Sequence, residues 1–268
     1  MQKDVHFYLT YALARHVGIP ADTAETVAWA DQFTDELTDP DLHEIQTQCD
    51  VIGNWGLRQI QLSVLVPFHF VPGNDPDHPW MTTRNSPHAR ALVRAAKGNP
   101  TQIGIALHAL QDTFSHENFS GWREELNSCY PWYYLTAAIP NVGHAEMRVI
   151  PDVVNYVWTD PRTGKRIDNR TRTMSAAKST YTWLVRLFGH TPDTADWTDL
   201  KPTLRDIFKL DSYDRRVDAL CAFSTDPTID YKDVTRRLEA SHKPVFIHAA
   251  CSHLAKAMNI LGPLPSTV

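Results

Sequence analysis

The stretch that decides the fold is residues 106–122, ALHALQDTFSHENFSGW, which carries His108, Asp112 and His116 at strict four-residue intervals. In an α-helix each such step advances only about 40° around the axis, so the three side chains lie in one stripe. Apolar residues fill the flanks, at Ile103, Ile105, Leu107 and Leu110. The pattern predicts a helix with a polar stripe in otherwise apolar surroundings.

The residue types in this stripe point to metal binding, since imidazole and carboxylate are ligands that zinc accepts. The rise from His108 to His116 is roughly 12 Å at 1.5 Å per residue, so one ion can hardly take all three side chains. A cluster of two or three ions with Asp112 bridging fits the spacing better. The alternative is a polar helix face that contains two histidines by chance. We favour the metal interpretation because the three-residue pattern is more specific than a histidine pair.

The composition is that of a globular protein. The chain has 268 residues, 43% of them hydrophobic and 21% charged, with a net charge of −5. This charge and a pI near 6.2 argue against an extended nucleic-acid or anionic-membrane surface. They leave open a nucleotide as a small substrate. Thirteen histidines are more than a chain of this length usually carries, which indicates that some of them have a function.

The sequence shows neither the pattern of a targeting segment nor the cysteine spacing of a disulfide framework or zinc site. The four cysteines are scattered and form no CxxC pair, so we expect reduced and mostly buried thiols. The start MQKDVHFYLT lacks a basic region followed by an apolar one, and no run of about 18 apolar residues occurs. We therefore expect a cytoplasmic protein without a membrane span.

Helical periodicity dominates and predicts an all-α fold, as one domain over residues 1–268. The expected helices are 5–17, 21–37, 41–66, 86–97, the central helix, 171–188, 200–209, 213–222 and 230–261, the last interrupted at Pro244. Residues 67–87 are expected to form a long loop, 127–140 an irregular segment, and 158–165 the tip of a hairpin. The candidate metal ligands fall in about residues 4–158, ahead of the C-terminal helices of about 171–261.

Two pairs of residues near the N-terminus are further candidate ligands. Asp4 and His6 face the same way only if the backbone is extended; an exposed polar pair is the alternative. Asp31 and Asp35 lie four apart on the second helix, where an inward carboxylate needs a cation or a hydrogen-bond partner. Asp35 is the better candidate and Asp31 the second choice, with helix-surface acids as the alternative.

Two more histidines lie in aromatic or irregular surroundings. His69, in VPFHFVPG, is either a core histidine or a ligand. His144 precedes Glu146 and Asp152, and Pro151 makes a regular helix doubtful, so either carboxylate can fold back beside it. The remaining eight histidines lack a partner at useful spacing and are expected to be structural or on the surface: His16, His43, His78, His88, His190, His242, His248 and His253.

The order of these residues resembles the zinc-dependent phospholipase C/P1 nuclease superfamily, an all-α fold with three zinc ions in a cleft. It is closest to an uncharacterised bacterial group of that type, whose segments look like DxHYYxTYxLAR, AxxxQxxDD, LHAxQDxxSH and GHxxxxxxPD. The resemblance covers roughly residues 4–158.

The resemblance implies a ligand set. One ion would take Asp35, His69, His108 and Asp112; a second would take His116, His144 and a carboxylate, for which Asp152 is preferred over Glu146. The third would take His6 and share Asp112. Enzymes of the superfamily begin with a Trp whose amine and carbonyl ligate the third zinc, and Asp4 is expected to replace that contact here.

This ligand set predicts a phosphoester hydrolase with two or three zinc ions and a small phosphate-containing substrate. Asp35 is expected to act as general base. Tyr8, Phe68, Phe70 and Trp158 are expected to wall an apolar substrate pocket. Three other functions stay open: a multi-iron oxygenase on the same ligands, a non-catalytic protein stabilised by its metals, and a hydrolase of amide or carboxyl-ester bonds. Neither the substrate nor the oligomeric state follows from the sequence.

Overall fold

A computed structural model describes residues 1–38, 45–129, 140–191 and 193–262. These residues form one mostly helical domain with a single two-stranded sheet. The all-α prediction is therefore confirmed at the level of fold class.

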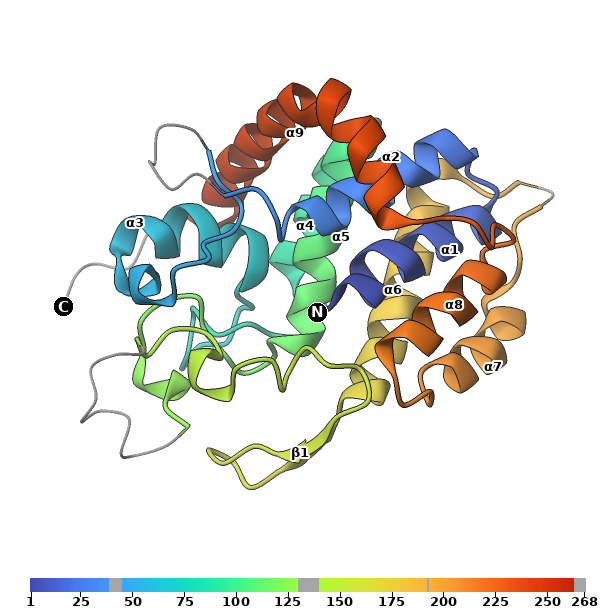
Figure 1. The fold of residues 1–268 in the computed structure, drawn as a ribbon. Helices are drawn as coiled ribbons and strands as arrows, with labels where there is room; N and C mark the ends of the chain where they lie inside the picture. Colours follow the sequence, from blue (N-terminus) through green and yellow to red (C-terminus); the bar gives the residue numbers. More distant parts are fainter. Residues whose placement is uncertain (39–44, 130–139, 192, 263–268) are drawn as a thin grey trace.

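The centre of the molecule is helix α5 (Pro100–Ser115), which is buried along nearly its whole length. Its start follows the expected signals: Pro100 stands at the first helical position, and the Asn99 side chain accepts a hydrogen bond from the Gln102 backbone N–H. Helices α2, α4, α6 and α9 pack around it (Figure 1). The polar stripe predicted from the sequence thus lies inside the protein core.

The N-terminal segment forms η1 (Asp4–Leu9), α1 (Thr10–Val17) and α2 (Ala21–Phe33). Gly18 ends α1 with φ of 89°, a left-handed conformation that glycine adopts without strain. Both expected helices are present. The second ends four residues before Leu37, so Asp35 lies in the turn after α2 rather than on the helix.

The helix expected over 41–66 is wrong for the described part of that range. Residues 45–51 are irregular, and three short helices follow: η2 (Ile52–Gly56), α3 (Arg58–Ile60) and η3 (Gln61–His69). Leu57 is extended between η2 and α3. Pro67, which has no N–H to donate, lies in the wide turns of the π-helix η3. Residues 41–44 lie outside the described residues.

The middle of the chain follows the expected pattern, except that the loop expected over 67–87 begins three residues later because Pro67 to His69 belong to η3. Residues 70–86 form a loop, and Ser86 caps α4 (Pro87–Ala95) by accepting from the Ala89 N–H. Two short 3-10 turns follow α5, namely η4 (Glu125–Asn127) and η6 (Ala145–Met147). The expected hairpin is present as β1 (Val157–Thr159) paired antiparallel with β2 (Arg166–Asp168). The expectation for 130–139 lies outside the described residues.

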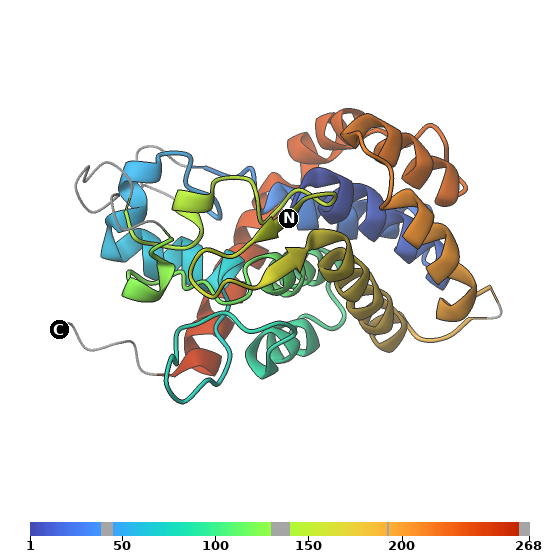
Figure 2. The same ribbon diagram turned by 90° about the horizontal axis from the view of Figure 1, so that it is seen from below.

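Four helices complete the domain: α6 (Asn169–Phe188), α7 (Trp197–Ile207), α8 (Tyr213–Phe223) and α9 (Tyr231–Leu261). The expected interruption of α9 at Pro244 is wrong, since the helix runs through it. Buried residues on both sides, such as Leu238 and Phe246, pack against the core and hold the helix despite the missing hydrogen bond. Helices α7 and α8 lie at one end of the molecule and residues 52–69 at the other (Figures 1 and 2).

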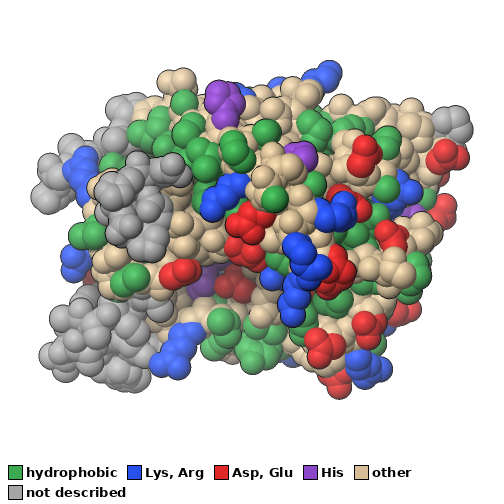
Figure 3. Space-filling view, turned by 45° about the horizontal axis from the view of Figure 1, so that its top comes forward, with side chains coloured by type: hydrophobic (Ala, Val, Ile, Leu, Met, Phe, Trp, Pro, Cys, Tyr) green, Lys and Arg blue, Asp and Glu red, His purple; other side chains and the backbone are tan. Residues whose placement is uncertain are grey.

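The surface agrees with the composition. On the face drawn in Figure 3, acidic and basic side chains are interspersed, without an extended area of one sign. No helix in the described part of the chain is both long and apolar enough to span a bilayer. All four cysteines are free thiols; Cys49, Cys129 and Cys221 are buried and Cys251 is exposed.

Close contact between α2 and α5 depends on Gly104. A Cβ atom at this position would lie 2.3 Å from the Val27 carbonyl oxygen and 2.8 Å from the Asp31 backbone nitrogen. Backbone atoms cannot yield as a flexible side chain does, so only glycine permits this approach. The contact brings Asp31 against the polar stripe of α5.

We therefore expect Gly104→Ala to destabilise the protein by about 1–3 kcal/mol through overpacking. Helix propensity alone predicts the opposite sign, a gain of up to about 1 kcal/mol. Chemical denaturation measures the difference. Gly53→Ala is the control, because a Cβ there meets no atom within 4 Å. A Gly104→Ala variant as stable as the control would show that the two helices separate at no cost.

Candidate metal centre

Among the described residues, three groups of histidine and aspartate side chains lie close enough to hold metal ions. In each group the candidate ligand atoms lie within 4.8 Å of one another. The groups are Asp35 with His69 and His108, His116 with His144 and Asp152, and His6 with Asp31 and His108. Residues far apart in the sequence thus meet at the C-terminal half of α5.

The first group surrounds the buried carboxylate of Asp112. The Oδ2 atom of Asp112 lies 3.1 Å from His69 Nδ1 and 3.3 Å from His108 Nε2. The Oδ1 atom of Asp35 lies 3.7 Å and 3.6 Å from the same two nitrogens. The end of α2, the end of η3 and α5 each contribute to this cluster. Two carboxylates and two imidazoles are a donor set that suits zinc.

His6 reaches the same cluster from η1. Its Nε2 lies 3.3 Å from Asp112 Oδ1, and its ring stacks on that of His108 with centroids 4.1 Å apart. This nitrogen is fully buried and has no hydrogen-bond partner among the described residues. An unpaired buried polar atom is costly, and a metal ion would satisfy it. The residues present therefore fit a metal ion at this position.

The second group lies at the C-terminal end of α5. The Nε2 atoms of His116 and His144 lie 3.1 Å and 3.4 Å from the two carboxylate oxygens of Asp152. Glu146, the other carboxylate considered for this position, accepts a hydrogen bond from the Cys129 N–H instead. The preferred residue, Asp152, is thus the one that the structure brings beside His144.

Asp31 lies behind the cluster. Its Oδ1 atom is 2.9 Å from His6 Nδ1 and 3.5 Å from His108 Nδ1, the ring nitrogens that point away from Asp112. Its Oδ2 atom accepts hydrogen bonds from Thr10 and Gln111. A carboxylate in this place fixes the tautomer and orientation of ligating imidazoles. Asp31 therefore hydrogen-bonds His6 from outside the cluster and lies within ion-pair distance of His108, whose Nδ1 has no hydrogen-bond partner among the described residues.

Backbone carbonyl groups orient the other three histidines. His69 Nε2 contacts the Thr47 oxygen at 2.8 Å, His116 Nδ1 the His69 oxygen at 2.8 Å, and His144 Nδ1 the Arg148 oxygen at 2.7 Å. A carbonyl oxygen only accepts, so each of these nitrogens carries the proton. In a neutral ring the opposite nitrogen, the one facing the aspartates, then offers a lone pair.

The amino group of Met1 also lies in this centre. It is hydrogen-bonded to Asp112 and lies 3.4 Å from Asp152 Oδ1. Burial opposes its charged form, but the carboxylates of Asp112, Asp152 and Asp35 outweigh burial and raise the pKa of the amine to about 11. An ammonium group therefore neutralises part of the negative charge between the first two groups.

The remaining pKa shifts follow the same balance of burial and charge. Burial disfavours the charged form of His108, but Asp35 and Asp112 raise its pKa to about 10. Burial also opposes ionisation of Asp112, yet His116, the Met1 amine and His108 hold its pKa well below the usual range. For His144 burial prevails and lowers the pKa to about 4. The Asp112 carboxylate thus remains charged and requires cations around it.

A small cavity of about 120 Å³ joins the first two groups and opens the centre to a ligand. Its polar lining comprises Met1, Asp35, Gln48, His69, Asp112, His116, His144 and Asp152, and its apolar lining Trp55, Leu65 and Phe70. Asp35 and Asp152 are the most accessible of the carboxylates, with side chains 22% and 18% exposed, against 1% for Asp112. They are the acids that a small substrate would meet.

Asp4 does not join these groups, which corrects the expectation that it replaces a ligand contact. Its buried Oδ2 accepts a hydrogen bond from Arg216 Nε at 2.6 Å. Asp4 and His6 are two apart on a helix rather than on an extended segment, so they point in different directions. The Met1 amine, which the sequence analysis missed, lies at the aspartates instead.

Only one of the four residues expected to wall the pocket lines the cavity. Phe70 does, and it stacks on His116 with ring centroids 4.4 Å apart. Tyr8 is buried with its hydroxyl directed at Asp230, Phe68 stacks on His253, and the Trp158 indole donates to Asn169. Trp55 and Leu65 line the cavity instead. Both belong to the segment expected to be one long helix.

The histidines set aside as structural are mostly where that interpretation puts them. His253 is buried with its Nε2 donating to the Pro67 carbonyl oxygen, and burial lowers its pKa to about 4. His190 and His248 are exposed, and His242 is half-buried. His43 lies outside the described residues.

The fold and the centre are those of a helical protein with buried His/Asp groups able to hold metal ions. The chain belongs to the family of unknown function DUF6765, which matches residues 1–259. No curated protein and no solved structure matches it. The family match includes the C-terminal helices, which the resemblance to the phospholipase C/P1 nuclease superfamily does not cover.

The buried pair of Asp4 and Arg216 makes a test of stability. Arg216→Met is expected to destabilise the protein by about 3–5 kcal/mol, because it leaves the Asp4 carboxylate buried and unpaired. Arg215→Met is the matched control; its guanidinium is 63% exposed and pairs with exposed Asp211, so the loss is less than about 1 kcal/mol. Urea denaturation measures both. Equal effects would contradict the structural role given to Asp4.

Proposed function

We propose that this protein is a metal-dependent hydrolase of phosphoesters that works with two or three zinc ions. The observation that carries the proposal is the convergence of imidazole nitrogens from His6, His69 and His108 on the Asp112 carboxylate. The outward nitrogens of these rings face Asp31 or the Thr47 carbonyl. When the rings are neutral, as metal binding requires, this arrangement presents their lone pairs to one point and resembles the outer-shell support of metal ligands.

The ligand sets follow from the groups. Asp35, His69, His108 and Asp112 would hold one ion, and His116, His144 and Asp152 a second. His6, with Asp112 shared, would hold a third. When bound, zinc ions would supply Lewis acidity towards a phosphoryl oxygen and would activate a water molecule for attack.

The chain's own groups complete the chemistry. Asp35 is the accessible carboxylate at the junction of cavity and cluster, so it is placed to orient the attacking water and to accept its proton. Trp55, Leu65 and Phe70 form the apolar side of the cavity and exclude water from that side. A cavity of about 120 Å³ admits a phosphoryl group and leaves the bulk of a larger substrate outside.

The family resemblance supports the same function. The order of Asp, His and His-x3-Asp-x3-His along the chain is similar to that in the zinc-dependent phospholipase C/P1 nuclease superfamily, whose fold we propose for this chain. A multi-iron oxygenase and a protein stabilised by metals without catalysis use the same ligand types. The identity of the metal and a substrate panel separate these functions.

The first test is metal content together with hydrolysis. We expect two or three zinc ions per chain by plasma mass spectrometry, for protein with an untagged N-terminus purified without chelator. We also expect hydrolysis of phosphodiesters or phosphomonoesters, but not of carboxyl esters, in a panel of nitrophenyl substrates. Iron with an absorption band would favour the oxygenase. Zinc without any hydrolysis would favour the non-catalytic function.

The variant for this test is Asp112→Asn, which keeps the side-chain shape and removes the charge that two sites share. We expect metal to be lost from both sites and activity to fall by at least about 100-fold. His190→Ala, an exposed histidine remote from the groups, is the control and keeps both. Full metal occupancy in folded Asp112→Asn protein would exclude the bridging role.

Asp31 gives a second, finer test. Asp31→Asn leaves every proposed ligand in place but removes the carboxylate that faces His6 Nδ1 and His108 Nδ1. We expect zinc affinity to fall by about 10- to 100-fold, as for outer-shell changes elsewhere. Competition with a chromophoric chelator measures it. An unchanged affinity would mean that Asp31 is a core hydrogen-bond partner only.

A further inference from the structure

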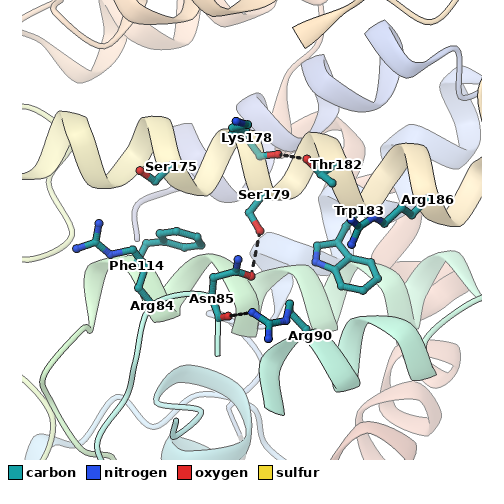
Figure 4. A pocket seen from close by; sticks show the side chains of 10 residues that line it. All are labelled: Arg84, Asn85, Arg90, Phe114, Ser175, Lys178, Ser179, Thr182, Trp183 and Arg186. Carbon is teal, nitrogen blue, oxygen red and sulfur yellow. Dashed lines mark hydrogen bonds between the residues drawn. The ribbon is translucent and has the colours of Figure 1, made fainter. Parts of the chain in front are cut away.

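A second cavity lies on the other side of α5 from the metal centre. It has a volume of about 650 Å³ and lies between α4 and α6, with Phe114 of α5 in its lining (Figure 4). Phe114 is two residues beyond Asp112, which turns it by about 200° away from the polar stripe. No described residue lines both cavities. The second cavity is therefore separate from the proposed reaction site.

The lining of this cavity is cationic. Four of its residues carry positive charge, namely Arg84, Arg90, Lys178 and Arg186, and no aspartate or glutamate lines it among the described residues. Such a concentration stands out in a chain whose net charge is −5. A hollow lined by charge of one sign raises the local concentration of counter-ions.

Most of this charge is not neutralised within the described structure. Arg84 alone has a carboxylate partner, Glu117, with Nη2 to Oε2 at 2.6 Å. Arg90 donates to the Asn85 carbonyl oxygen at 2.7 Å. Lys178 and Arg186 make no ion pair with any described carboxylate and are both exposed. Two free cations and the guanidinium group of Arg90, which has no carboxylate partner among the described residues, thus remain available to a ligand.

Neutral donors accompany the cations. Ser175, Ser179 and Thr182 lie on the same face of α6 as Lys178, at helical spacing. Figure 4 shows Ser179 pointing across the cavity, where it donates to Asn85 Oδ1 at 3.4 Å. Asn85 itself has φ of 52° and holds the opposite wall by donating its N–H to Thr113. The hydroxyl groups of Ser175 and Thr182 donate to the Thr171 and Lys178 carbonyl oxygens, so the cationic groups are the main donors that remain for phosphate oxygens.

The ring of Trp183 contacts two arginine side chains. The Trp183 ring lies 5.2 Å from the Arg186 guanidinium and 6.0 Å from that of Arg94, and its side chain is buried. These contacts orient the guanidinium groups and leave their N–H groups free. The charged groups of the cavity thus favour anion binding.

We propose that the cavity between α4 and α6 binds a small anion that carries two or more phosphate groups. Its volume is in the range of small-ligand sites, which favours a compact anion over a nucleic-acid strand. A second basic cavity, between α6 and α7, is the natural comparison. There Arg170 and Lys209 are paired with Asp168 and Asp206, and the lining includes apolar Met174 and Phe208. That cavity has less free charge.

The test is equilibrium dialysis of the full, metal-loaded chain against radiolabelled pyrophosphate, with metal content checked afterwards. We expect saturable binding that Lys178→Gln/Arg186→Gln weakens by at least about tenfold, because two charged contacts are lost. Both side chains are exposed, so the variant is expected to fold. Lys201→Gln/Arg205→Gln, which removes the same charge from the comparison cavity, should change the affinity by less than about twofold.

Each other result overturns the proposal. Absence of saturable binding at millimolar pyrophosphate would show that the cavity is only a solvated basic surface. Equal weakening by both double variants would show unspecific attraction to positive charge. Binding lost in Asp112→Asn but kept in Lys178→Gln/Arg186→Gln would place the ligand at the metal centre. The proposal does not depend on phosphoester hydrolysis, since binding is measured without turnover.

Discussion

The rest of the structure depends on one constraint, the negative charge of Asp112 inside the core. One carboxylate oxygen faces His6 and the Met1 amine, and the other faces His69 and His108. A buried carboxylate is tolerated only when cations and hydrogen-bond donors surround it. These partners come from Met1, η1, η3 and α5 itself. The packing of η1 and η3 against α5 therefore also assembles the centre. The close α2–α5 contact at Gly104 adds Asp31 to it.

The irregular segments have a definite part in this assembly. The carbonyl oxygens that fix three histidines belong to Thr47, His69 and Arg148. Thr47 lies in an irregular stretch, His69 ends η3, and Arg148 has φ of 52° just after η6. In the interior of a helix these oxygens would accept from the backbone and would not be free. The helices thus supply the ligands, and the breaks between them supply the groups that orient those ligands.

The sequence predicted what is local and missed what is set by distant partners. The stripe of His108, Asp112 and His116 follows from helical spacing alone. The order of the other histidines along the chain suggested that they lie close to this stripe. The ion pair of Asp4 depends on Arg216, 212 residues away, and nothing near Asp4 indicates it. The long helix expected over 41–66 and the break expected at Pro244 failed for a related reason. Leu57 is extended and separates two short helices, whereas Pro244 lies inside a continuous helix. Tertiary packing sets these outcomes, and the local sequence does not show it.

The two sides of α5 differ in charge for a physical reason. The helix ends at the metal centre, where its free carbonyl groups add partial negative charge to that of four aspartates and favour cations. On the other side of α5 lies Phe114, and the walls come from α4 and α6, whose cations have few carboxylates near them. Glu117, just past the end of α5, pairs with Arg84 of the cavity and lies 3.5 Å from Arg172 of α6. Glu117 therefore neutralises one of the four cations of the cavity and connects α6 to the segment after α5.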